Sequence, residues 1–155
     1  FDQYSCADRP MMVGYITGAD VMIRAELFKT LGGFDEDIFM YAEEVEFTWR
    51  VVHRAGMTVI SVPDAKICHL EGASFTNAGK GSHGSFHERR FVNGLKGAVI
   101  MYSKCYGKEV AKRYLQLLQR AYLKFYCIAA LLFMRNKKKI YQTKRAVVKR
   151  FLADY

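Results

Sequence analysis

Short apolar runs alternate with amphipathic stretches in the first half of the chain. Three extended segments are predicted, over residues 13–23, 57–62 and 65–70. Two helices are predicted, over residues 24–31 and 43–55. The pair Gly32-Gly33 is expected to end the first helix and Gly56 the second, because glycine readily adopts the left-handed conformation that follows a helix. Strands that alternate with helices indicate an α/β layered unit.

The helix predicted over residues 43–55 has a candidate apolar stripe. Val45, Trp49 and Val52 follow one another at spacings of four and three residues, which places them on one side of a helix. Trp49 therefore has two interpretations, as a core residue or as a platform on which a sugar ring stacks. The core interpretation is the stronger of the two, and the sugar-binding one stays open.

The second half of the chain is predicted to be helical. Residues 71–84 are rich in Gly, Ser, Ala and Asn, which is typical of a loop or a hinge between domains. Three helices follow, over residues 85–106, 108–134 and 139–153. Ser85 and Glu88 have capping-box spacing at the start of the first. The predicted organisation is an α/β part over residues 1–75, a flexible loop over 76–85 and a basic helical tail over 86–155.

Charge divides the chain at the same place. The net charge is +9, but residues 1–75 hold six Lys and Arg against twelve Asp and Glu, a balance of −6. Residues 76–155 hold eighteen Lys and Arg against three Asp and Glu, a balance of +15. This asymmetry suggests two tasks: proton or metal chemistry in the acidic part, and binding to an anionic surface in the basic part.

Cysteine usage and apolar run length exclude some classes of protein. The four cysteines are far apart, without the Cys-x-x-Cys spacing of a zinc knuckle, and are expected to be buried thiols of a reducing compartment. The longest apolar run, residues 125–134, has ten residues, whereas a membrane-spanning helix needs about 20. A transmembrane helix is therefore not expected.

The basic tail has three interpretations. Residues 139–153 form a basic amphipathic helix that favours an anionic membrane surface. Its predicted apolar face comprises Ile140, Val147, Val148, Phe151 and Leu152. Nucleic-acid binding ranks lower, because no recognised nucleic-acid motif is present. The third interpretation is a solvated helical bundle that packs against the α/β part. Exposed apolar helices also make a homo-oligomer plausible.

Acidic residues cluster just before and within the predicted helix 43–55. Six carboxylates fall within twelve residues: Asp35, Glu36, Asp37, Glu43, Glu44 and Glu46. Aromatic residues interleave them, which is unlike a solvated acidic tail. The simplest explanation is that acids in a first helical turn are stabilised by the helix dipole, by about 0.3–1 kcal/mol each. The other is an acid–base site whose apolar side chains pack inward around a carboxylate.

Three of the acids and one histidine are candidates for chemistry. Successive helical residues point about 100° apart, so Glu43 and Glu44 cannot share one role, while Glu43 and Glu46 lie on neighbouring faces. His69 is predicted at a strand end, with Cys68 on the opposite, core-facing side. A carboxylate base with a nearby imidazole suits a site that activates a hydroxyl beside a metal-bound leaving group. Tyr41 lies near the acids and is expected to line an acceptor site.

Several motifs occur in a specific order between residues 12 and 75. They are Gly18-Ala19-Asp20 with Val21 to Arg24, Leu31-Gly32-Gly33-Phe34-Asp35-Glu36, Phe39-Met40-Tyr41-Ala42-Glu43-Glu44-Val45-Glu46, Arg50, Gly56, Pro63 and His69-Leu70-Glu71-Gly72-Ala73-Ser74. This order resembles the C-terminal half of bacterial family 2 glycosyltransferases, and rhamnosyltransferase-like enzymes of surface polysaccharide biosynthesis in particular. The helical tail resembles the membrane-proximal tail of that group more loosely.

The resemblance implies a GT-A fold, here its acceptor-side half followed by an α-helical tail, and an inverting transfer from a nucleotide-diphospho-sugar to a glycan or lipid-linked acceptor. Glu43-Glu44 matches the family's Glu-Asp motif, whose second acid is the base. Glu44 would then be the catalytic base, one methylene longer than the family's Asp, and Glu43 would orient the acceptor. His69 matches a metal ligand, and Gly18, Ala19 and Asp20 match the loop beside sugar and acceptor.

Part of the family's pattern is not found. An Asp-x-Asp metal motif does not precede residue 12, so a complete enzyme is expected to include an N-terminal, nucleotide-binding half. A divalent cation, Mg²⁺ or Mn²⁺, is expected only in that complete enzyme. The resemblance and the basic tail together imply a peripheral protein at the cytoplasmic face of a bacterial membrane. The alternative is a non-catalytic module that docks on membranes or partners through its basic half.

Overall fold

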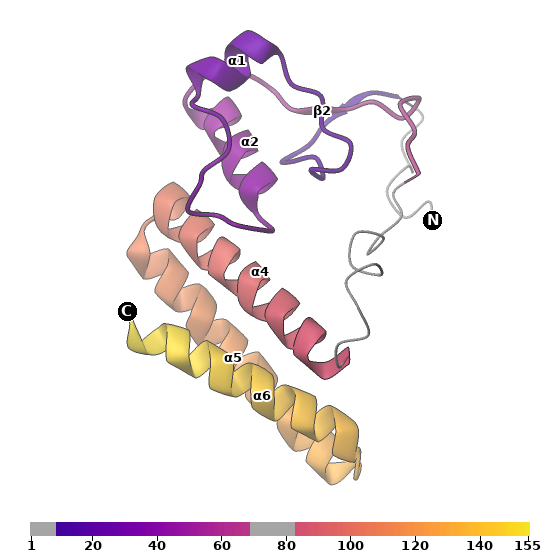
Figure 1. Cartoon of the computed structure of the whole chain (residues 1–155), viewed down its shortest axis with the longest axis vertical. Helices are drawn as coiled ribbons and strands as arrows, with labels where there is room; N and C mark the ends of the chain where they lie inside the picture. The colour runs from indigo at the N-terminus through magenta and orange to yellow at the C-terminus, as the bar shows by residue number, and fades with distance from the viewer. Residues whose placement is uncertain (1–8, 69–82) are drawn as a thin grey trace. The chain divides into compact units, whose positions relative to one another are not determined.

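The chain divides into two units, residues 1–86 and 87–155. The structure is a computed structural model, and it describes residues 9–68 and 83–155 (Figure 1). Helices make up most of this part of the chain, with one small antiparallel sheet. This content is compatible with an α/β protein.

The first unit is built around two helices and two very short strands. In chain order the elements are β1 (Met11–Met12), α1 (Ala25–Thr30), α2 (Glu43–His53) and β2 (Ile60–Ser61). Met11 pairs with Ser61, and Met12 with Ile60. The core centres on Phe47 and Val51 of α2, with Val59 from the segment that leads into β2. The apolar residues of α1 pack against this cluster, which fixes α2 in place.

The Gly32-Gly33 pair ends α1 as its sequence predicts. Both glycines have positive φ values, 82° and 73°. The Gly32 amide donates to the Lys29 carbonyl at 3.0 Å, and the Gly33 amide donates to the Phe28 carbonyl at 2.9 Å. These two bonds form a Schellman motif, which satisfies carbonyl groups at the end of a helix. The motif turns the chain toward Phe34, whose ring lies 5.5 Å from that of Phe47.

The strands are shorter than the apolar pattern predicts. No strand forms over residues 13–23 or 65–68 of the described chain, and the segment 57–62 contributes only the two residues of β2. The strand predicted over 57–62 is therefore much shorter than expected, and the end of the segment predicted over 65–70 lies outside the described residues. A strand needs a hydrogen-bonding partner as well as an extended, apolar sequence, and β1 and β2 have only each other within the described part of this unit.

The predicted stripe on α2 was also misplaced. Val52 is exposed, and Val45 and Trp49 are only half-buried. The buried face is one residue away and consists of Glu46, Phe47, Thr48, Arg50 and Val51. The apolar pattern did not reveal this face, because charged and hydroxyl side chains occupy three of its five buried positions.

Three long helices form the second unit (Figure 1). They are α4 (His83–Tyr106), α5 (Lys108–Leu131) and α6 (Arg135–Ala153), close to the predicted ranges. Gly107 alone links α4 to α5, and its φ of 94° suits the sharp reversal. All three helices contribute to one apolar core, which contains Leu95, Val99, Ala111, Leu115, Val147 and Val148.

The predicted apolar face of α6 packs inside this bundle. Val147 and Val148 are buried, and Phe151 and Leu152 pack against them, while Ile140 stays exposed. The prediction that this face lies on a membrane is therefore wrong, because the other helices already cover it. No helix in the described ranges has the length and apolar character needed to cross a bilayer.

The cysteines differ from expectation. Cys68 and Cys127 are exposed and Cys105 is half-buried, whereas all were expected to be buried. Cys127 is two positions from the buried Ala129, so it points about 200° away from it around α5. Cys68 has no sheet partner to cover it. Cys6 lies outside the described residues.

Candidate functional site

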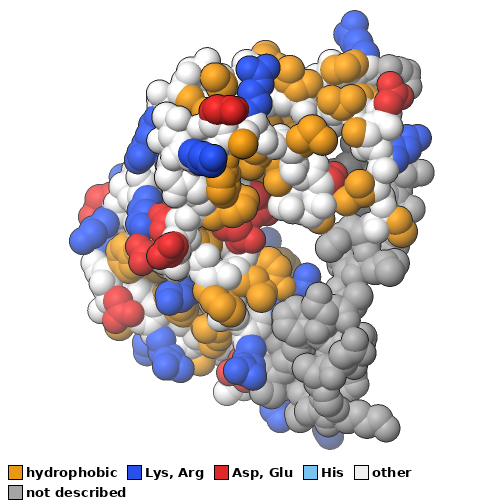
Figure 2. Space-filling model, turned by 45° about the horizontal axis from the view of Figure 1, so that its top comes forward, with side chains coloured by type: hydrophobic (Ala, Val, Ile, Leu, Met, Phe, Trp, Pro, Cys, Tyr) orange, Lys and Arg blue, Asp and Glu red, His pale blue; other side chains and the backbone are white. Residues whose placement is uncertain are grey.

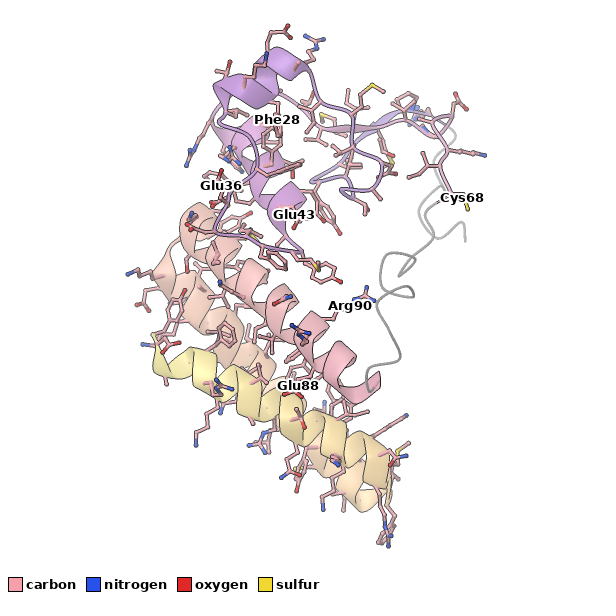
Figure 3. All side chains as sticks on the ribbon, viewed as in Figure 1. Phe28, Glu36, Glu43, Cys68, Glu88 and Arg90 are labelled. Carbon is pink, nitrogen blue, oxygen red and sulfur yellow. The ribbon has the colours of Figure 1, made fainter. Side chains whose placement is uncertain are left out.

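The candidate site begins at a strained turn that leads into α2. Tyr41 and Ala42 have φ values of 66° and 76°, in the left-handed region that side chains rarely adopt. Such conformations cost on the order of 1–3 kcal/mol each and cluster at functional sites. Neither residue is Gly or Asn, so nothing in the sequence signals the turn. Its effect is to place Glu43 and Glu44 directly at the helix start. Figure 3 shows Glu43 at this end of α2.

Glu44 is the carboxylate with a perturbed proton affinity. Burial raises the pKa of Glu44, the carboxylate's hydrogen bond with its own backbone amide opposes the rise, and repulsion from Glu43 adds to it. A carboxylate that is partly withdrawn from water is a stronger base than an exposed one, which suits a group that accepts a proton. The Thr48 hydroxyl donates to the Glu44 carbonyl at 2.7 Å and so holds this turn of the helix.

A glycine from a distant segment lies beside Glu44. A Cβ atom built on Gly18 would lie 3.8 Å from the Glu44 Cβ atom, which is van der Waals contact. Gly18 belongs to a turn in which the Asp20 amide donates to the Thr17 carbonyl at 3.1 Å. The structure therefore brings together two of the predicted site segments, the Gly18-Ala19-Asp20 loop and the Glu43-Glu44 pair. Both Ala19 and Asp20 are exposed in this turn.

Glu43 supplies a second carboxylate with spare hydrogen-bonding capacity. Its Oε2 atom is buried and has no hydrogen-bond partner among the described residues. A buried acceptor without a partner is costly, unless a ligand donates to it. Glu43 thus suits the predicted role of a group that holds an incoming hydroxyl.

Glu46 does not belong to this pair. Its carboxylate accepts two bonds from the Arg50 Nε, at 2.8 and 3.0 Å, and one from the Arg50 Nη2 at 2.6 Å. The same guanidinium donates to the Leu31 carbonyl and, at 2.8 Å, to the Gly33 carbonyl. This buried clamp fixes α2 to the end of α1. The spacing of four residues predicts the ion pair, but nothing in the sequence predicts the two carbonyl contacts.

Trp49 and Tyr41 are the two aromatic residues predicted to contact a sugar or an acceptor. Trp49 is five positions after Glu44, or about 140° around the helix, and its ring lies 4.6 Å from that of His53. The Arg54 guanidinium lies 5.9 Å from the Trp49 ring centroid. Tyr41, half-buried, directly precedes the two acids. The sugar-binding role of either ring stays a prediction.

A metal site does not form within the described part of the chain. No three His, Cys, Asp or Glu side chains there are close enough to hold an ion together. Of the six clustered acids, Glu46 is bound to Arg50, and the Asp35 carboxylate accepts the Asp37 amide at 3.0 Å in a local turn. The predicted ligand His69 lies outside the described residues.

Comparison with known proteins gives one pair of relatives. The chain is 35% identical over 83 residues to an N-acetylglucosaminyl-diphospho-decaprenol L-rhamnosyltransferase of Mycobacterium tuberculosis, in the strains CDC 1551 / Oshkosh and ATCC 25618 / H37Rv. The match covers 54% of this chain and 26% of each relative, so the chain spans about a quarter of their length. No family model and no solved structure matches. The identity supports a glycosyltransferase-like relationship.

Proposed function

We propose that the chain forms the acceptor-side part of a family 2, inverting glycosyltransferase with a GT-A fold. The observation that carries this proposal is Glu44, a carboxylate of raised pKa at a strained helix start beside Gly18. Gly18 and Glu44 are 26 positions apart in sequence, and the sequence predicts both as residues of the site. The identity with the rhamnosyltransferase points to the same class of enzyme.

In this proposal Glu44 acts as general base on the acceptor. Its carboxylate removes the proton from the acceptor hydroxyl while the hydroxyl oxygen bonds to the anomeric carbon of the donor sugar. The bond from that carbon to the nucleotide diphosphate breaks on the opposite face, and the diphosphate leaves with the electron pair. Attack from the opposite face inverts the configuration. General bases of this kind contribute about 10²- to 10⁴-fold to the rate.

Glu43 has a positioning role in the same step. Its Oε2 atom would accept a hydrogen bond from a second hydroxyl of the acceptor sugar, which satisfies an atom that has no other partner among the described residues. Holding the acceptor at two points orients the reacting hydroxyl toward Glu44. The Glu46–Arg50 clamp keeps the α2 turns that follow rigid.

A divalent cation belongs to the proposal only for the complete enzyme. The described residues do not assemble a ligand set, so no step here depends on the ion. Mg²⁺ or Mn²⁺, when bound, would stabilise charge on the leaving diphosphate. His69 is proposed as one of its ligands, together with groups from outside the described residues.

Exposed apolar surface supports a larger domain around the first unit. Hydrophobic side chains reach the surface over much of the upper part of Figure 2. The exposed hydrophobic residues of the two short strands and the loops near them are Met11, Met12, Tyr15, Met22, Met57, Ile60, Val62 and Ile67. A two-stranded sheet is marginal by itself, and apolar patches of this kind mark interaction surfaces. We propose that a nucleotide-binding half covers this surface.

The name of the relatives suggests substrates. They transfer L-rhamnose to N-acetylglucosaminyl-diphospho-decaprenol. We propose a nucleotide-diphospho-sugar as donor here, and as acceptor a sugar linked through a diphosphate to a long isoprenoid. Such an acceptor stays in a membrane, so the protein would work at the cytoplasmic face of the bacterial membrane, in the synthesis of surface polysaccharide.

The test is Glu44→Gln in the intact gene product. Transfer of labelled L-rhamnose from its nucleotide donor to N-acetylglucosaminyl-diphospho-polyprenol should fall by about 10²- to 10⁴-fold, because the amide cannot accept the proton. Donor binding, measured by calorimetry, should be nearly unchanged. Glu26→Gln, an exposed acid in the first turn of α1, is the matched control and should keep full activity. Full activity in Glu44→Gln would end the assignment and favour the non-catalytic docking module instead.

A further inference from the structure

The turn between α5 and α6 presents an unusual apolar surface. Leu131, Leu132 and Phe133 are 76%, 63% and 90% exposed, and Met134 is also exposed. We call residues 131–134 the α5–α6 tip. It forms one end of the helical unit in Figure 1. Three consecutive large apolar side chains that are each more than 60% exposed are uncommon on a protein surface.

Phe133 stands where glycine is normally found. The Phe133 amide donates to the Ala130 carbonyl at 3.2 Å, and the Met134 amide donates to the Ala129 carbonyl at 2.8 Å. This is the same Schellman arrangement that Gly32 and Gly33 make after α1. Phe133 has a φ of 53°, which is strained for any residue with a side chain. The strain places a fully exposed aromatic ring at the apex, and nothing within the described fold rewards that placement.

Cations follow the tip directly in the sequence, and α5 and α6 carry few acids. Arg135, Lys137, Lys138 and Lys139 follow it directly and are all exposed. Residues 110–153 hold twelve Lys and Arg and no Asp or Glu. An apolar tip followed by several cations matches an anionic lipid surface, because the apolar side chains can enter the acyl region while the cations stay beside the phosphates.

The backbone of the tip is also suited to an apolar environment. The amides of Leu132, Phe133, Met134 and Arg135 all donate to carbonyl groups of the same turn. An unpaired amide is expensive to bring into lipid, so a turn with internal hydrogen bonds enters at lower cost. Nucleic acid would match the cations but not the apolar apex.

We propose that the α5–α6 tip inserts into the interface of an anionic membrane, with Phe133 at its apex. The inference deepens the proposed function, whose acceptor is attached to a lipid, by naming the surface that meets the bilayer. It replaces the predicted membrane face of α6, which is buried in the bundle.

The first test is co-sedimentation of the full chain with vesicles of phosphatidylglycerol and phosphatidylcholine, and with phosphatidylcholine alone. The chain should bind the anionic vesicles and bind the neutral ones weakly. Phe133→Gly should lower partition by about tenfold, from the lost burial of the ring. Because glycine suits the left-handed position, its melting temperature should equal or exceed that of the parent. Loss of binding therefore cannot be attributed to unfolding.

Leu117→Gln is the matched control. Leu117 is 63% exposed, as is Leu132, but lies on α5 about 21 Å from Leu131 along the helix. Its substitution should leave vesicle binding unchanged. The triple change Lys137→Gln, Lys138→Gln and Lys139→Gln should lower binding to anionic vesicles on the order of 100-fold, at about fivefold per cation.

The proposal is overturned if Phe133→Gly binds vesicles as the parent does, or if Leu117→Gln loses as much vesicle binding as Phe133→Gly. It is also overturned if the chain binds a DNA duplex but not vesicles. A dimer in light scattering that Phe133→Gly converts to a monomer would show that a second copy covers the tip, and would overturn it too. Failure of this proposal can be distinguished from failure of the proposed catalytic function. Glu44→Gln should bind vesicles normally, and Phe133→Gly should still transfer sugar to a short-chain, water-soluble acceptor.

Discussion

In the first unit α2 buries Glu46, Thr48 and Arg50, whereas the buried core of the helical unit is wholly apolar within the residues described. Burying a charged group is costly unless the group is paired. The paired Glu46 and Arg50 side chains, with their contacts to two backbone carbonyls, hold α2 in a defined position. This is the helix whose start carries Glu43 and Glu44. The second unit has no charged residue in its apolar core within the part described, and most of its lysines and arginines are exposed, although the Arg145 Nε atom is buried.

The two units also place backbone strain differently. In the first, Tyr41 and Ala42 carry it next to half-buried carboxylates. In the second, Phe133 carries it at a fully exposed apex. The comparison suggests a division of work, with chemistry at the start of α2 and membrane attachment at the α5–α6 tip.

The largest expected effect comes from removing Arg50 from the buried Glu46–Arg50 pair. Arg50→Ala leaves the Glu46 carboxylate buried without a counter-ion and frees the carbonyls of Leu31 and Gly33, so it should lower the free energy of unfolding by about 3–5 kcal/mol. Trp49, the only tryptophan in the chain, lies on the same helix, so its fluorescence in a urea titration reports this loss.

Arg54→Ala is the control for Arg50→Ala. Arg54 is exposed, and its contact with the Trp49 ring is worth about 0.5–1 kcal/mol. The double variant Glu46→Met with Arg50→Met should recover part of the loss, since apolar side chains can replace a buried pair. If Arg50→Ala costs no more than Arg54→Ala, the clamp does not fix α2.

A second variant probes the apolar core of the other unit. Leu115 is fully buried between the three helices, so Leu115→Ala should cost about 2–5 kcal/mol, from lost burial and the cavity left behind. Far-UV circular dichroism, which follows helix content, measures it. Leu117→Ala, two positions away and exposed, should stay within about 0.5 kcal/mol. Equal effects of the two changes would contradict the bundle packing.

The smallest expected effect concerns Glu44 and pH. The pKa of Glu44 is raised in the folded state, so its protonated form is the one that folding favours. The group therefore contributes stability below its unfolded pKa and loses that contribution as pH rises through the raised folded value. Glu44→Gln removes the carboxylate, so the variant should melt above the parent at about pH 7–8, with the difference shrinking toward about pH 4.

Glu26→Gln removes one exposed carboxylate and is the matched control for the loss of a negative charge. A variant that loses activity but gains thermal stability near neutral pH is the pattern expected of a catalytic group held in an unfavourable environment. A Glu44→Gln protein that melts below the parent at every pH would instead indicate a structural role.

Local chemistry in the sequence predicted the helices and several of their ends. The Gly32-Gly33 pair and Gly107 lie where positive φ values are required, and α2 begins at the acid pair. Glu46 and Arg50 are four positions apart, a spacing that brings two side chains together on a helix, and they form an ion pair. These features depend on neighbours within a few positions, so a single sequence contains the necessary information.

The strand pairing, the buried helix faces and the contacts at the candidate site became clear from the tertiary structure alone. It determined which strands find partners, which face of α2 and α6 is buried, and that Gly18 lies beside Glu44. It also placed Glu46 in the core, bound to Arg50, while Glu43 and Glu44 lie half-buried at the start of the same helix. Each of these outcomes depends on contacts between residues far apart in sequence, so identical carboxyl side chains on one helix come to lie in different environments.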